Sequence, residues 1–181
     1  MKKFVIFLRG VNVNGISIKM EELRNVMEGM LYYDVKTILA SGNIIVTTTD
    51  DKMTLEDHKD KIETKLGQHF GYEAFIIIKT SEQITMILEE SQNHAVPEGC
   101  HHYILLSNDR SVAQELKVQF ELCAKGEKEQ LILGDYGIYW IVPKGNTLQS
   151  DFGKKILGKK KFKNLLTSRT MNTIEKKKQY I

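Results

Sequence analysis

The feature that most constrains the fold is the order of strand-like and helix-like segments in residues 1–80. Apolar runs typical of strands alternate there with segments whose apolar residues recur at helical spacing. In chain order we expect a strand over Lys3–Arg9, a helix over Met20–Met30, strands over Val35–Ala40 and Ile44–Thr48, a helix from Thr54 to about Phe70, and a strand over Tyr72–Lys79. This β-α-β-β-α-β order predicts a ferredoxin-like subdomain.

Two local signals support these boundaries. Ser41-Gly42-Asn43 joins the second and third strands, and its residue types suit a tight hairpin. Thr54 is followed three residues later by Asp57, which predicts a capping box at the start of the second helix.

The second half of the sequence repeats this order in part. Thr80 and Gln83 predict the start of another helix, and Ser91–Gly99, which contains Pro97, predicts a linker or an exposed loop. After that loop we expect a strand over His102–Ser107, a helix carrying Val112, Leu116 and Phe120 that is capped by Asn108 or Asp109, and strands over Gln130–Leu133 and Ile138–Val142 around the hairpin Gly134–Gly137.

The C-terminal part departs from the repeated order. Phe152–Leu166 predicts a helix that is broken at Gly158, no closing strand is evident, and Thr170–Tyr180 predicts a terminal helix capped by Ser168 or Thr170. We therefore expect an α+β fold of two ferredoxin-like (βαββαβ-type) subdomains packed together, over residues 1–90 and 91–181. The second has a modified, basic helical C-terminal end.

Composition favours a globular cytoplasmic protein. The apolar runs, such as Phe75–Ile78, are too short to cross a bilayer, and the N-terminal run that ends at Arg9 lacks the length and cleavage site of a signal peptide. Cys100 and Cys123 are the two cysteines, which predicts reduced thiols rather than a disulfide framework.

Charge is distributed unevenly along the chain. Residues 152–181 carry ten Lys or Arg and one acid, Glu175, whereas the rest carries 16 basic and 22 acidic residues. Such asymmetry indicates an anionic partner, although a solvated lysine-rich helix is the simpler interpretation. Nucleic acid could bind at Lys154, Lys159, Lys160 and Lys163, with the interleaved Phe152 and Phe162 either stacking on bases or packing into the core.

The loop that follows the first strand is rich in polar and permissive residues. Arg9 is followed by Gly10, Asn12, Asn14 and Gly15, which together can surround a phosphate or a carboxylate. The alternative is a tight turn in which the asparagines bond the local backbone. The spacing matches neither a P-loop nor a dinucleotide fingerprint.

Metal and nucleophile chemistry have little support in the sequence. Cys100-His101-His102, with His94 nearby, has no usual ligand spacing, and adjacent histidines in a strand point to opposite faces. No local motif marks a Ser-His-Asp triad. We therefore expect no metal and no cofactor, and the sequence leaves open whether the protein is an enzyme.

Three segments together resemble the uncharacterised bacterial family known as domain of unknown function 1697. They are Leu8–Gly15 with the following Met20–Leu23, which is similar to the family's LRGINVGG run, Ile38–Ile44, which contains SGN, and Ser168–Thr173. The resemblance implies two ferredoxin-like subdomains and carries no established activity. This chain departs from the pattern at Asn14, where the family has glycine, and at Thr170-Met171, where it has Asn-Trp.

These segments define the candidate site. Their polar residues are of types that packing seldom requires, and we expect them to bind an anionic ligand, namely a nucleotide, a phosphorylated metabolite or nucleic acid. The expected ligand-binding residues are Arg9, Asn12, Gly15, Ser41, Asn43, Arg169 and Asn172. Two alternatives stay open: an enzyme acting on a phosphorylated or carboxylated metabolite, and a protein–protein interaction module whose oligomeric state the sequence does not define.

Overall fold

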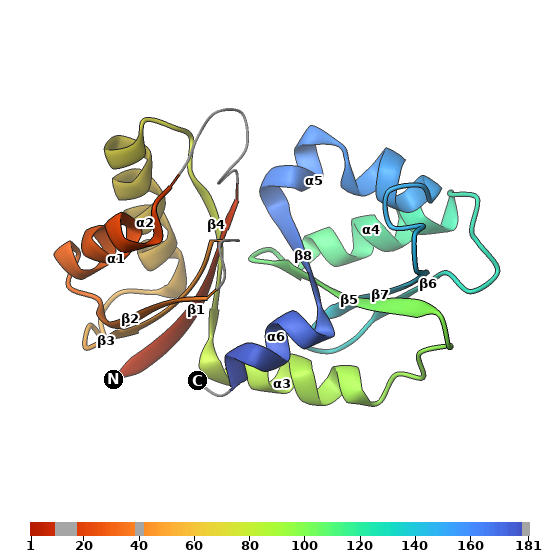
Figure 1. The fold of residues 1–181 in the computed structure, drawn as a ribbon, viewed down its shortest axis with the longest axis horizontal. Coiled ribbons are helices and arrows are strands. Elements are labelled where there is room, and N and C mark those ends of the chain that lie inside the picture. Colours follow the sequence, from red (N-terminus) through yellow and green to blue (C-terminus); the bar gives the residue numbers. More distant parts are fainter. Residues whose placement is uncertain (10–17, 39–41, 179–181) are drawn as a thin grey trace. The chain divides into compact units, whose positions relative to one another are not determined.

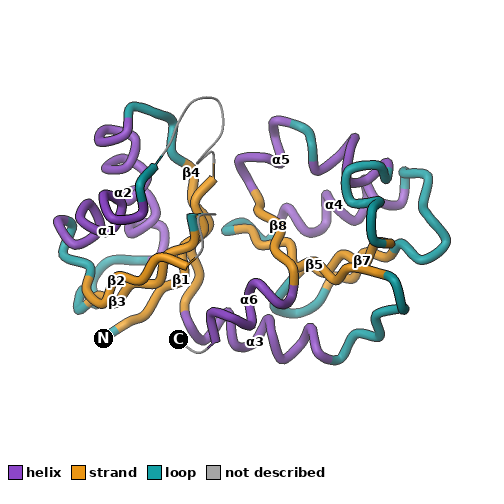
Figure 2. Tube along the Cα trace, viewed as in Figure 1, coloured by secondary structure: helices purple, strands orange, loops and turns teal. Residues whose placement is uncertain are grey.

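The structure is a computed structural model that describes residues 1–9, 18–38 and 42–178 of the 181-residue chain. The contacts between Cα atoms divide the chain into two units, Met1–Ile84 and Thr85–Lys178, which we call unit 1 and unit 2. Both units combine helices with strands (Figures 1 and 2).

Unit 1 contains one antiparallel sheet and two covering helices. Its elements are β1 (Lys2–Arg9), α1 (Met20–Gly29), β2 (Tyr33–Ile38), β3 (Asn43–Thr48), α2 (Leu55–Phe70) and β4 (Phe75–Thr80). The strand order is β2-β3-β1-β4, so β1 lies at the centre between β3 and β4. The six segments expected in this half are confirmed.

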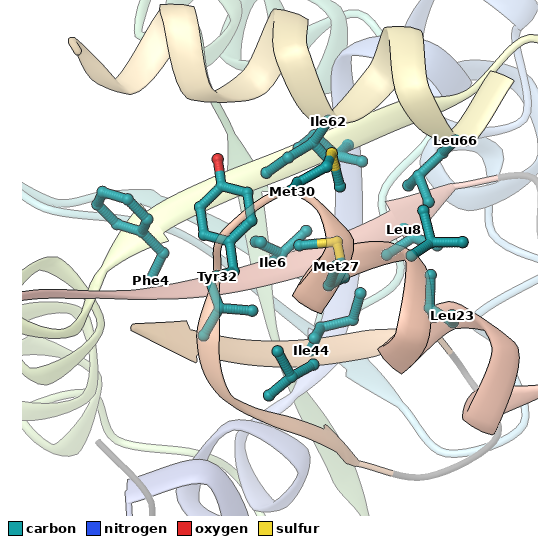
Figure 3. Packing of buried hydrophobic residues seen from close by; sticks show 14 of the residues in the cluster. Phe4, Ile6, Leu8, Leu23, Met27, Met30, Tyr32, Ile44, Ile62 and Leu66 are labelled. Atoms are coloured by element: carbon teal, nitrogen blue, oxygen red, sulfur yellow. The ribbon is translucent and has the colours of Figure 1, made fainter. Parts of the chain in front are cut away.

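Helices α1 and α2 pack on one face of this sheet. Alternate residues of β1 point toward the helices, as the two-residue period of a strand requires. Figure 3 shows this core, which is formed by Phe4, Ile6, Leu8, Leu23, Met27, Met30, Tyr32, Ile44, Ile62 and Leu66. The capping box of α2 is also confirmed, since the Thr54 side chain accepts from the Asp57 amide and the Asp57 carboxylate accepts from the Thr54 amide.

Helix α3 (Ser81–Gln92) follows β4 directly, and the division between the units falls within it. Thr80 and Gln83 bond each other's backbone amides at 3.0 and 3.2 Å, as expected for the start of this helix.

Unit 2 has a sheet with the same strand order. Its elements after α3 are β5 (Cys100–Ser107), α4 (Ser111–Glu121), β6 (Gln130–Leu133), β7 (Ile138–Pro143), the π-helix η1 (Phe152–Leu157), α5 (Lys160–Leu165), β8 (Leu166–Thr170) and α6 (Met171–Lys178). The order β6-β7-β5-β8 repeats the unit 1 order, with β5 at the centre, and all neighbours are antiparallel. Helices α4 and α5 lie on one side of this sheet in Figure 1, and α3 and α6 on the other.

The expectation that unit 2 lacks a closing strand is wrong. Leu166–Thr170 forms β8, which pairs with β5 from Ser107 opposite Leu166 to Tyr103 opposite Thr170. The segment has a single apolar residue, and β8 pairs on one side only, so neither propensity nor an apolar run announces it. Pairing with β5 makes this segment a strand.

The expected helix break at Gly158 is confirmed. Gly158 lies between η1 and α5, and a Cβ there would lie 2.5 Å from the Lys154 carbonyl oxygen. Within the part of the chain that the structure describes, no helix combines the length and the apolar character needed to span a bilayer.

Candidate functional site

Arg9 is the last residue of β1, at the same end of the sheet as the β2–β3 hairpin. Phe7 pairs with Asn43, and the Leu8 amide donates to the Gly42 carbonyl over 2.8 Å. On the other side of β1, Arg9 pairs with Phe75, the first residue of β4. The strand pairing therefore brings Arg9 and the β2–β3 hairpin, which contains the SGN segment, to the same end of the unit 1 sheet.

The Arg9 guanidinium is half-buried, and this burial lowers its pKa from the ordinary value. Arginine stays protonated at physiological pH even when its pKa falls, so the position holds a partly desolvated positive charge. Removing water from a cation strengthens its attraction to any anion that approaches.

Asn43 has a structural role in the hairpin. Its side chain is fully buried, and its amide nitrogen donates to the Ile38 carbonyl over 3.3 Å, across the loop. Gly42 next to it has a φ of +69°, which glycine adopts without strain. These contacts match the interpretation of Ser41-Gly42-Asn43 as a hairpin signal.

Three of the expected site residues, Asn12, Gly15 and Ser41, lie outside the described residues. Two others, Arg169 and Asn172, belong to unit 2, whereas Arg9 and Asn43 belong to unit 1. The site of seven residues therefore stays a prediction.

Arg169 lies on β8 opposite Ile104. Its Nη1 donates to the Thr167 hydroxyl over 2.6 Å and to the Ser168 carbonyl over 2.8 Å, so local contacts fix part of the guanidinium. Asn172 is exposed in the first turn of α6, beside the hydroxyl pair of Thr170 and Thr173 at 2.8 Å. The sequence alone gives none of these local bonds.

Glu90 occupies an anion-binding nest that the sequence analysis missed. Its carboxylate accepts from the amides of Asp135, Tyr136 and Gly137 over 2.6, 3.1 and 3.1 Å, and from the Tyr139 hydroxyl over 2.6 Å. Burial alone would raise the pKa of Glu90, but the Tyr139 hydroxyl and the three amides outweigh it and hold this pKa below the ordinary value. The β6–β7 hairpin was expected from Gly134–Gly137, but nothing in the sequence pairs it with α3.

Next to this nest lies a cluster of aromatic side chains. The rings of His94 and Tyr139 are 4.4 Å apart between centroids, and those of His94 and His102 are 5.6 Å apart. The buried atoms His94 Nδ1 and His102 Nε2 have no hydrogen-bond partner among the described residues. Burial, and then His94, lowers the pKa of His102. No group of three potential metal ligands occurs within residues 1–9, 18–38 and 42–178.

A shallow hollow of about 580 Å³ lies elsewhere in unit 1. It is lined by the C-terminal end of α1 and by α2, at residues that include Leu31, Lys61 and Lys65. Its lining contains neither Arg9 nor Asn43, so it is separate from the expected site.

The four lysines proposed for nucleic acid, Lys154, Lys159, Lys160 and Lys163, are all exposed on η1, α5 and the turn between them. The two interleaved aromatic residues are buried in the core of unit 2, since Phe152 is 0% and Phe162 is 1% exposed. The stacking interpretation of these two phenylalanines is therefore wrong, and the core interpretation is confirmed.

Residues 1–139 match the family described as "Protein of unknown function (DUF1697)". The chain belongs to this family. The suspected family is thereby confirmed; the segments Leu8–Gly15 and Ile38–Ile44 lie within the matched residues, whereas Ser168–Thr173 lies outside them and its resemblance stays a prediction. The family match itself states no activity.

The DUF1697 fold is shared with a solved bacterial structure. The chain is similar to the conserved bacterial protein SP0830 from Streptococcus pneumoniae, with 21% identity, a TM-score of 0.78, and coverage of 99% of this chain and 98% of that one. At this identity the similarity shows the fold alone. No curated protein matches the sequence.

Proposed function

We propose that this DUF1697 protein binds an anionic ligand, a nucleotide or a phosphorylated metabolite, at the edge of unit 1 where Arg9 ends β1. The observation that carries the proposal is a half-buried arginine, Arg9, at the end of β1 that lies at the same end of the sheet as the β2–β3 hairpin. A partly desolvated arginine favours carboxylates and phosphates, which it binds through two parallel hydrogen bonds.

Unit 2 supplies a second argument. Its β6–β7 hairpin holds the same place in the strand order as the β2–β3 hairpin of unit 1, and it binds a carboxylate, that of Glu90. Backbone amides of a turn form such anion-binding concavities. We infer from the repeated order that both units are ferredoxin-like and related by duplication, so an anion at the hairpin of unit 1 is consistent with the fold.

The expected site also includes Asn12, Gly15, Ser41 and Asn43 from unit 1 and Arg169 and Asn172 from unit 2, and these stay part of the proposal. We further propose that the protein is bacterial and cytoplasmic, which agrees with the free thiols of Cys100 and Cys123.

The proposal is tested by calorimetric titration of the purified chain with inorganic pyrophosphate and with a panel of nucleoside phosphates. We expect Arg9→Gln to weaken binding by roughly tenfold or more, because a charged hydrogen-bond pair contributes about 1.5–3 kcal/mol. Arg24→Gln is the matched control, since Arg24 is an exposed arginine of α1 in the same unit. Thermal melts establish first that both variants are folded.

Two results would overturn the proposal: equal affinities of wild type, Arg9→Gln and Arg24→Gln, or no binding of any probe by the wild type. Arg169→Gln in the same titration separates the two sets of expected residues. Loss of affinity for the same probe supports a role of Arg169, and an unchanged affinity removes Arg169 from the site.

A further inference from the structure

A cluster of exposed lysines surrounds the junction of η1 and α5 in unit 2. We call it the lysine corner, and it consists of Lys154, Lys155, Lys159, Lys160, Lys161 and Lys163. The turn at Gly158 is tight, because a Cβ there would lie 2.5 Å from the Lys154 carbonyl. Helix α5 follows η1 directly after this turn, and the two helices contact each other.

Acidic side chains neutralise the corner in part. Lys155 pairs with Asp151 over 2.9 Å, and Lys161 pairs with Glu115 of α4 over 2.8 Å. For Lys154, Lys159 and Lys160, no ion pair occurs with any residue that the structure describes. Asp151 also lies near Lys154, since this lysine contributes to lowering the pKa of the Asp151 carboxyl. Six lysines against the two carboxylates of Asp151 and Glu115 leave the corner with a net positive charge.

Lys154 and Lys155 lie in the last turn of η1 and Lys163 in the last turn of α5, where a cation is favourable. Local stability does not account for Lys159 and Lys160 at the start of α5. Lys159 is the N-cap of α5 and makes no side-chain cap, and Lys160 and Lys161 follow in the first turn. Cations are unfavourable at that end of a helix, where the backbone dipole is positive. The packing of this region comes from other residues, the buried Phe152, Ile156 and Phe162.

The chemistry of the corner selects among possible partners. Phe152, Ile156 and Phe162 are buried, so they are not available to insert into a bilayer or to stack on unpaired bases. Lysine is depleted in protein–protein interfaces, whereas phosphate groups are a common partner of its compact charge. The stretch from Lys154 to Lys163 contains no arginine that could read guanine edges.

We propose that the lysine corner binds the phosphate backbone of double-stranded nucleic acid without preference for base sequence. A duplex is favoured over a single strand because its charge density is higher and because the corner offers no stacking surface. Three lysines without ion pairs predict about three phosphate contacts, and the logarithm of affinity then falls with the logarithm of salt concentration with a slope of about −3.

The test is fluorescence anisotropy with a short labelled DNA duplex, a second duplex of shuffled sequence, and the single strand, between about 50 and 200 mM salt. We expect equal affinity for the two duplexes and weaker binding of the single strand. The triple variant Lys154→Gln, Lys159→Gln, Lys160→Gln weakens duplex binding roughly tenfold or more at the lower salt concentration and flattens the slope by about 2–3.

A matched control distinguishes the corner from overall charge. Lys19→Gln, Lys52→Gln and Lys65→Gln remove the same charge from exposed positions of unit 1, and we expect the affinity to stay within about twofold. Glu115→Gln releases Lys161 from its pair, and we expect tighter duplex binding with a slope steeper by about one. A gain of binding in this variant is not explained by misfolding.

Three outcomes would overturn the inference. The triple variant could bind the duplex as tightly as the wild type, the two triple variants could lose affinity equally, or wild type could bind vesicles with about one-third phosphatidylserine while leaving the duplex free. The two proposals are tested independently. If the lysine corner binds the duplex, Arg9→Gln leaves duplex binding unchanged, whatever its effect on the binding of small phosphates.

Discussion

The hydroxyl of Tyr139 on β7 donates a 2.6 Å hydrogen bond to the carboxylate of Glu90, which lies 49 residues earlier on α3. The same hydroxyl also lies 3.0 Å from the Ile87 carbonyl oxygen, to which it can donate. Three backbone amides of the β6–β7 hairpin donate the remaining hydrogen bonds to the Glu90 carboxylate. One carboxylate thus joins the second half of α3 to the hairpin of unit 2.

We predict that Glu90→Gln lowers the free energy of unfolding by about 1–3 kcal/mol, because several charge-assisted hydrogen bonds weaken together. Glu89→Gln is the matched control, since Glu89 is the exposed neighbour on α3. Urea unfolding at neutral pH measures both. A loss no greater for Glu90→Gln than for Glu89→Gln would show that the hydrogen bonds of the Glu90 carboxylate do not stabilise the fold.

The pH dependence of this contact has a definite sign. The pKa of Glu90 is lower in the folded chain than in the unfolded chain, so the carboxylate stabilises the fold above the ordinary glutamate pKa of about 4.3. That stability is lost as pH falls through the lowered pKa of the folded state. The difference between wild type and Glu90→Gln should therefore shrink below about pH 4, and a constant difference down to that range would contradict the prediction.

Trp140 and Glu129 form a buried pair in unit 2. The indole Nε1 donates to the Glu129 carboxylate over 3.0 Å, and the two residues are 1% and 7% exposed. We predict that Glu129→Ala costs about 1–3 kcal/mol because it leaves the indole donor without its partner. Glu129→Gln retains an acceptor oxygen and should cost less.

Fluorescence is a suitable measurement here, because Trp140 is the single tryptophan of the chain and reports on unit 2. Glu127→Ala, an exposed glutamate two residues away, is the control and should change stability little. Equal losses for Glu129→Ala and Glu127→Ala would show that the indole bond contributes nothing.

Gly153 and Gly29 make a contrasting pair of helical glycines. A Cβ at Gly153 in η1 would clash with the Thr147 carbonyl oxygen and press on Trp140, whereas a Cβ at Gly29 in α1 meets nothing within 4 Å. We predict that Gly153→Ala lowers the free energy of unfolding by about 2 kcal/mol or more, and that Gly29→Ala raises it by about 0.5–1 kcal/mol. Thermal unfolding of both variants checks the opposite signs, and two shifts of the same sign would contradict this argument.

His58 is buried beside Tyr32, whose hydroxyl lies 2.8 Å from its Nδ1, and its Nε2 has no partner within the described segments. We predict that Tyr32→Phe costs about 1–3 kcal/mol, because the imidazole then loses its partner at Nδ1. Tyr33→Phe, at an exposed neighbour, is the control for the loss of a hydroxyl.

The same histidine makes stability depend on pH. Burial lowers the pKa of His58 in the folded chain; the nearby Asp50 raises this pKa by a smaller amount, and Lys61 lowers it further. The unfolded chain therefore binds a proton more readily, and stability falls as pH drops below about 6.5. His58→Gln should show a smaller fall between about pH 7 and 5, with the remainder in part from His102, whose pKa is also lowered. An unchanged fall would contradict the role of His58.

Much of the fold was predictable because local chemistry and the tertiary structure agree. The apolar runs of β1 and β4, the helical spacing of Leu23 and Met27, and the capping box at Thr54 are each local signals. The family was predictable from short local segments, of which Leu8–Gly15 and Ile38–Ile44 lie within the matched residues. The hairpin of Gly42 and Asn43 was predictable because positive φ restricts the residue types.

What the sequence by itself determined is therefore the order of the elements other than β8, many of the core-facing residues and the uneven charge, because each depends on residues close together in the chain. The tertiary structure alone decided that Leu166–Thr170 is a strand and that Glu90 fills a hairpin nest. Glu90 binds amides 45 or more residues away in the chain, and β8 is a strand because it pairs with the distant β5. No local pattern in the sequence specifies such partners. The place of Arg9 beside the hairpin likewise follows from strand pairing, since register alone brings Phe7 opposite Asn43.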